Sequence, residues 1–62
     1  MEKNKFILFF IKYAGYTPDQ AEDFYNEFPL LAEELALKIR KSILDDKSCS
    51  NSLKQEIEKY FV

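Results

Sequence analysis

The 62-residue chain contains no histidine and only one cysteine, Cys49. Without histidine, the side chain that most often acts as a general base near neutral pH is missing, and a serine or cysteine nucleophile lacks its usual activating partner. A single thiol can form no disulfide within the chain, and without imidazole it cannot complete a zinc site. We therefore expect a protein that is not an enzyme, with no catalytic residues and no bound metal.

Glycine is equally scarce: the chain contains one, Gly15. A glycine-rich loop that binds the phosphates of a nucleotide cannot be built from one glycine. We therefore expect no nucleotide and no other cofactor.

Long apolar runs are also absent. The longest extends from Phe6 to Ile11 and ends at Lys12, whereas a membrane span needs about 20 apolar residues and a signal peptide about 7–15. We expect no association with a membrane. The lone thiol of Cys49 is typical of a reducing compartment, so the expected location is the cytoplasm.

The one glycine and two prolines divide the sequence into helical segments. Gly15 is the residue type expected just after a helix end. Thr17, Pro18 and Gln20 then have the types of an N-cap, a first helical position and the closing residue of a capping box. The sequence predicts helices at about residues 3–14, 18–27, 29–46 and 52–61, with Ser52 opening a second capping box.

This pattern indicates an all-α fold, a compact bundle of three to four short helices in a single domain of residues 1–62. The chain is 47% hydrophobic and has ten aromatic residues, which provide large areas for burial. A folded chain of this size buries only about 60% of the surface that its unfolded form exposes, so its stability is small. Tight packing or a partner chain must compensate.

Apolar residues recur at helical spacing within these segments. The second segment places four on one side: Ala21, Phe24, Tyr25 and Phe28. The main stripe predicted for the third consists of Leu31, Leu35, Ile39 and Ile43, with Ala32 and Ala36 beside it.

More apolar surface is present than four short helices can obviously enclose. The first segment is apolar nearly all round, and Leu30, Leu37 and Leu44 recur every seven residues on the far side of the third. Either the first and last helices pack on both sides of the third helix, or these leucines form a seam for a dimer or another partner. The sequence does not choose between these two interpretations.

Charge is sorted along the chain. No basic residue occurs between Lys12 and Lys38, so a net charge of −2 conceals a strongly acidic middle between two mildly basic ends. The second predicted helix carries four carboxylates opposite its apolar side: Asp19, Glu22, Asp23 and Glu27. We call these four residues the acidic face. A surface of one sign can select a partner of the other sign.

These features favour a small non-enzymatic interaction module that blocks or tethers another protein, one with a basic surface, through the acidic face and the surplus apolar surface. Self-association as a homodimer is also expected. Two alternatives stay open: an acidic mimic of nucleic acid that inhibits a DNA- or RNA-binding protein, and a purely structural homo-oligomer. Direct nucleic-acid binding is not expected, because acids occupy the region that would face the phosphates. The composition suits a bacterial or phage-encoded regulator.

Overall fold

A computed structural model describes residues 1–62 and contains helices without any strand. The helices are α1 (Lys3–Tyr13), α2 (Pro18–Glu27), α3 (Pro29–Asp45) and α4 (Asn51–Glu58), followed by the short 3-10 helix η1 (Lys59–Phe61). The predicted all-α bundle of three to four short helices is thereby confirmed.

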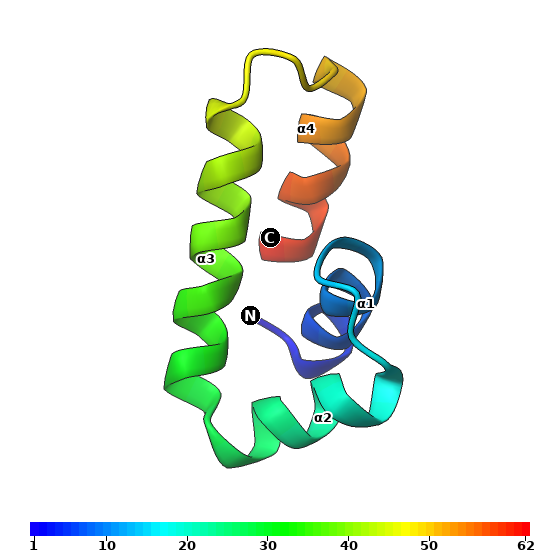
Figure 1. Ribbon diagram of the computed structural model, residues 1–62, viewed down its shortest axis with the longest axis vertical. Helices are drawn as coiled ribbons and strands as arrows, with labels where there is room; N and C mark the ends of the chain where they lie inside the picture. The colour runs from blue at the N-terminus through cyan, green and yellow to red at the C-terminus, as the bar shows by residue number, and fades with distance from the viewer.

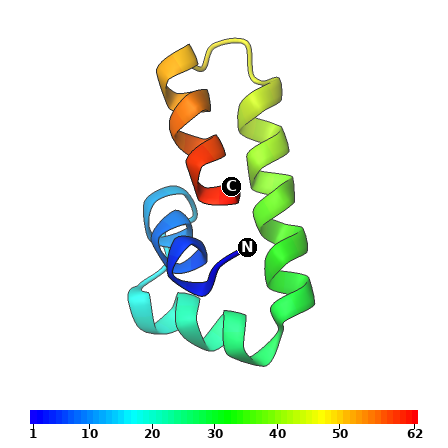
Figure 2. The ribbon, with the colours of Figure 1, turned by 180° about the vertical axis from the view of Figure 1, so that it is seen from behind.

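The longest helix, α3, forms one edge of the molecule (Figure 1). Helix α4 runs antiparallel beside its second half, α2 crosses near its first half, and α1 fills the space between α2 and the end of α4. Seen from behind, the other three helices again lie on one side of α3 only (Figure 2). The outward side of α3 is therefore not covered by another helix.

Local signals set the start of α2 as predicted. The backbone N–H of Gln20 donates to Oγ1 of Thr17 at 3.2 Å, and the backbone N–H of Thr17 donates to Oε1 of Gln20 at 3.1 Å, which completes a capping box. Upstream, Gly15 adopts a positive φ of 73°, a conformation that glycine reaches without strain. The short connection between α1 and α2 is thus specified by three residues.

The start of α4 corrects the sequence prediction. The N-cap is Ser50, whose Oγ accepts the backbone N–H of Leu53 at 3.2 Å, so the helix begins at Asn51. Ser52 lies within the first turn and is not the cap. Two serines two residues apart offer the same cap chemistry, and the path of the preceding loop selects the first of them.

The core is built around α1. Phe6, Phe9 and Phe10 are fully buried, together with Ala21 of α2, Ala32 and Ala36 of α3, and Ile57 of α4. The rings of Phe6 and Phe10 stack at 4.2 Å between centroids, and Phe9 meets Phe61 edge-on at 5.2 Å. The interpretation in which α1 and α4 pack on both sides of α3 is therefore wrong, because both helices lie on the same side of α3 (Figures 1 and 2).

The apolar side of α3 is also rotated relative to the predicted stripe. Ala32 and Ala36 are fully buried, whereas Leu31 is 56% exposed. Small side chains let the backbone of α3 approach the phenylalanine rings of α1, so the alanines, rather than Leu31, face the core.

A polar contact joins the two antiparallel helices. Arg40 of α3 pairs with Glu58 of α4, with Nη2 of the guanidinium 2.7 Å from the carboxylate Oε1. The same guanidinium lies 5.5 Å from the centroid of the Phe61 ring, a cation–π contact.

None of the helices combines the length and the apolar character that crossing a membrane would require.

Candidate functional site

The acidic face lies on the solvent side of α2. Asp19, Glu22, Asp23 and Glu27 are all exposed, whereas Ala21 on the opposite side of the helix is fully buried. At about 100° per residue, the four carboxylates spread over an arc of about 140° centred away from the core. The structure therefore brings all four predicted residues together on one surface.

None of these carboxylates is neutralised within the molecule. The three ion pairs of the structure involve Glu33, Glu56 and Glu58, and no residue of the acidic face takes part in one. No group of His, Cys, Asp and Glu side chains is placed to hold a metal ion. The acidic face is thus an uncompensated, solvated patch of negative charge.

Two further acids continue this charge onto the first turns of α3. Glu33 lies 3.3 Å from the amino group of Met1, and Glu34 is exposed without an ion pair. The next basic side chain along the chain is Lys38, which is also exposed. The negative charge therefore extends around the corner between α2 and α3.

Apolar side chains are exposed at the same corner and along α3. Phe28 is 50% exposed, Leu30 77% and Leu37 47%, while Leu44 is half-buried. We call Leu30, Leu37 and Leu44 the leucine stripe. Phe28 was predicted to belong to the apolar side of α2, but the turn before Pro29, at φ −133° and ψ 63°, carries it half out of the core.

An open hollow between α2 and α3 was not predicted. Its lining consists of Phe24, Leu31, Glu34, Leu35 and Lys38, and its volume is about 290 Å³. In the sequence, the only sign of this hollow is that two leucines, Leu31 and Leu35, are interspersed with two charged residues, Glu34 and Lys38, at helical spacing. The predicted stripe placed Leu31 in the core, so the sequence did not predict that Leu31 would line an open hollow.

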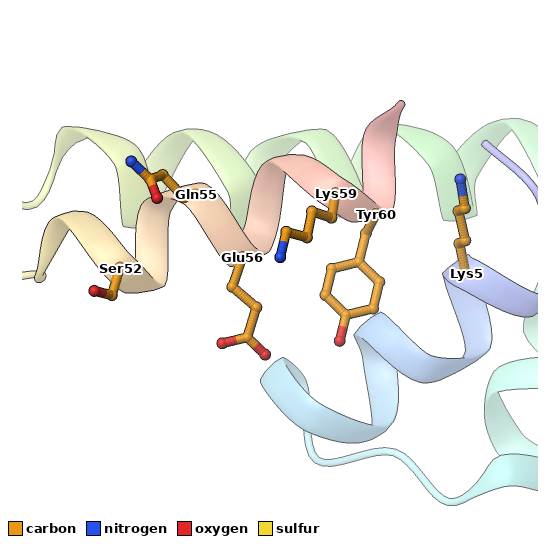
Figure 3. A pocket seen from close by; sticks show the side chains of 6 residues that line it. All are labelled: Lys5, Ser52, Gln55, Glu56, Lys59 and Tyr60. Atoms are coloured by element: carbon orange, nitrogen blue, oxygen red, sulfur yellow. The ribbon is translucent and has the colours of Figure 1, made fainter.

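A second, larger hollow of about 590 Å³ separates α1 from α4. Figure 3 shows that its polar side chains point in different directions instead of converging on one point. The Nζ of Lys5 donates to the backbone oxygen of Val62 at 2.7 Å, and Lys12 pairs with Glu56. No nucleophile faces a base there, so we assign no chemistry to this hollow.

The pair between Lys12 and Glu56 is the main electrostatic feature beside that hollow. The hydrogen bond between their side chains raises the pKa of Lys12 and lowers the pKa of Glu56. Next to it, the hydroxyl of Tyr13 is buried without a hydrogen-bond partner. Burial raises the pKa of Tyr13, and the nearby carboxylate of Glu56 adds to the effect.

Cys49 is a free, half-buried thiol in the loop between α3 and α4. In that loop Asp46 accepts hydrogen bonds from the side chain and the backbone N–H of Ser48, which lower the pKa of Asp46. These contacts close a short turn next to the thiol.

Comparisons with family models, with curated proteins and with solved structures give no match for this chain. The acidic face and the exposed apolar side chains are the features of this chain that bear on function.

Proposed function

We propose that this protein is a non-enzymatic interaction module that binds a partner protein with a basic surface and blocks or tethers it. The acidic face carries the proposal, because four exposed carboxylates on one side of α2 have no cationic partner inside the molecule. We further propose that the module acts in a reducing cytoplasm, which the free thiol of Cys49 favours.

A face of this kind affects how fast the protein associates with a partner. Charges of one sign on a small surface steer a partner of opposite sign and raise the rate of encounter, whereas like-charged partners are rejected. The interaction is screened over about 10 Å at 0.1 M salt. Binding through the acidic face should therefore weaken steeply as salt rises.

The face also has a small cost for the fold. Asp23 and Glu27 are four residues apart on α2, and like charges at this spacing repel mildly. Asp19, in the first turn of α2, stabilises the helix N-terminus, but Asp23 and Glu27 are better accounted for by a role in recognition than by a role in stability.

The test compares two variants that remove the same charge from different places. Asp23→Asn with Glu27→Gln neutralises half of the acidic face, and Glu2→Gln with Asp45→Asn removes two exposed acids elsewhere. Both should keep the melting temperature of the parent chain, since all four side chains are solvated. The immobilised parent chain and both variants are then exposed to host extract at low and at moderate salt.

The proposal requires that a protein retained by the parent chain at low salt is retained by the Glu2/Asp45 variant but lost by the Asp23/Glu27 variant. Moderate salt should weaken retention by the parent chain as well. Identical retention by both variants would show that the acids serve only solubility.

The spacing of the acids favours one class of basic partner for a second test. Asp19 and Glu27 span about 12 Å along the helix, and a row of carboxylates at such intervals can occupy a site built for phosphates. If the retained protein binds nucleic acid, a short duplex should displace it from the acidic face. Retention that the duplex does not change would exclude the nucleic-acid mimic.

A further inference from the structure

The outward side of the longest helix, α3, is not covered by any other element (Figures 1 and 2). The other helices lie on the opposite side of α3 in both views (Figures 1 and 2). The leucine stripe runs along this uncovered side, and its first two members are 77% and 47% exposed. With a rise of about 1.5 Å per residue, the stripe extends for about 21 Å.

We propose that the leucine stripe binds a second copy of this chain, with the two α3 helices antiparallel and related by a two-fold axis beside Leu37. The proposal therefore states which residues of the two α3 helices face each other, in addition to the apolar character of the contact. This inference is independent of the acidic face on α2, because it rests only on residues of α3.

The spacing of the leucines supports the two-fold axis. In an antiparallel pair centred on Leu37, residues equally far before and after Leu37 face each other across the axis. Leu30 lies seven residues before Leu37, and Leu44 lies seven after it. Leu37 then meets Leu37 of the second copy, and Leu30 meets Leu44 of the second copy at both ends of the seam.

Charge complementarity decides between the antiparallel and the parallel arrangement. Glu34 and Lys41 flank the stripe on one side, and both are exposed without an ion pair. In the antiparallel register Glu34 lies at nearly the height of Lys41 of the second copy, and the symmetry gives this pair twice. A parallel pair would instead place Glu34 against Glu33 and Lys41 against Arg40 of the second copy, and like charges at a seam are unfavourable.

The opposite flank shows the same complementarity. In this register Glu33 lies beside Arg40 of the second copy. Within the chain, Glu33 pairs with the Met1 amino group and Arg40 pairs with Glu58. Both side chains nevertheless remain partly accessible to solvent. The acids of the seam thus occupy its first half and the bases its second half. Only antiparallel pairing brings the two halves together.

The size of the seam sets the expected affinity. Stable interfaces bury on the order of 600 Å² or more from each partner, about one seventh of the 4401 Å² surface of this chain. One side of one helix, about 21 Å long, is a small interface on that scale. We therefore expect a dimer with a dissociation constant on the order of micromolar.

Sedimentation of the full chain tests the association. At about 100 µM, well above a micromolar dissociation constant, the parent chain should sediment with about twice its mass of 7.4 kDa. Leu37→Glu should sediment as a folded monomer, because it places a charge in the seam. Leu31→Glu is the matched control, since Leu31 lies on the same helix about 120° from the stripe and is also exposed.

The control variant should remain dimeric, with a dissociation constant within about threefold of that of the parent chain. A monomeric parent chain would overturn the proposal. So would a Leu37→Glu variant that stays dimeric.

Disulfide trapping tests the register and remains informative if Leu37→Glu fails to fold. In a Cys49→Ser background, Leu37→Cys should form a crosslinked dimer on oxidation. Leu30→Cys alone should not crosslink, whereas a mixture of the Leu30→Cys and Leu44→Cys chains should. Crosslinking of Leu30→Cys with itself would show a parallel seam and would overturn the antiparallel register.

Discussion

At the scale of single residues, Thr17 is a polar side chain whose hydrogen bond bears directly on folding. Thr17→Ala leaves the N–H of Gln20 without its side-chain acceptor and should lower the free energy of unfolding by about 1 kcal/mol. Thr17→Ser keeps the acceptor and should change it little. Urea titration of both variants checks this, and an equal loss from both would mean that the hydroxyl contributes nothing.

Tyr13 presents the opposite situation, a buried hydroxyl without a partner. Such a group costs free energy because it has lost its hydrogen bonds to water. Tyr13→Phe removes it and keeps the ring, which packs 5.1 Å from Phe9. We expect the free energy of unfolding to stay the same or to rise by about 1 kcal/mol. A clear loss in thermal or urea unfolding would show that the hydroxyl is hydrogen-bonded in solution.

At the scale of elements, the two serines near the start of α4 allow a direct test of its boundary. Ser50→Ala removes the acceptor for the N–H of Leu53 and should cost about 1 kcal/mol. Ser52→Ala lies within the first turn and should change stability by less than about 0.5 kcal/mol. The two variants are compared by thermal unfolding. The reverse order would place the cap at Ser52.

Helix α1 permits a second matched comparison, because Leu8 and Phe9 are adjacent but differ in burial. Phe9 is fully buried, and Phe9→Ala should cost about 3–5 kcal/mol, close to the whole stability of a small domain. Leu8 is 56% exposed, and Leu8→Ala should cost much less. Circular dichroism should show an unfolded chain only for Phe9→Ala. Similar losses from both would contradict the burial of Phe9 and the exposure of Leu8.

At the scale of the whole molecule, the absence of histidine and the direction of the pKa shifts predict how stability depends on pH. The lowered pKa of Glu56 gives stability that is present above its ordinary value of 4.5 and is lost as pH falls through the folded pKa. The raised pKa of Lys12 gives stability that is present below 10.5 and is lost as pH rises through the folded pKa. The raised pKa of Tyr13 adds to the loss at high pH.

The free energy of unfolding should therefore be nearly constant between about pH 5 and pH 9 and fall slightly outside that range. Urea titrations across the range check this, and Glu56→Gln should flatten the part of the curve that arises from its pair with Lys12. A transition near pH 6 to 7 would contradict the prediction, because no histidine is present to cause one.

Much of the local structure follows from the sequence alone. Gly15, Thr17 and Pro18 determine where α1 ends and α2 begins, because a positive φ, a capping box and a proline at the first position depend only on neighbouring residues. The position of the acidic face also follows from sequence, since Asp19, Glu22, Asp23 and Glu27 fall opposite Ala21 by helical spacing.

Only the tertiary structure decided which side of α1 is buried and which side of α3 turns inward. Sequence spacing places Leu35 about 40° and Ala32 about 100° from Leu31 around the helix. All three are apolar, so spacing alone cannot decide which of them turns inward. The choice depends on what packs opposite, and the rings of Phe6, Phe9 and Phe10 fit against small alanines rather than against Leu31. Close packing depends on the shapes of both facing surfaces. The burial of the phenylalanines of α1 and the exposure of Leu31 are therefore determined only when all four helices are in place.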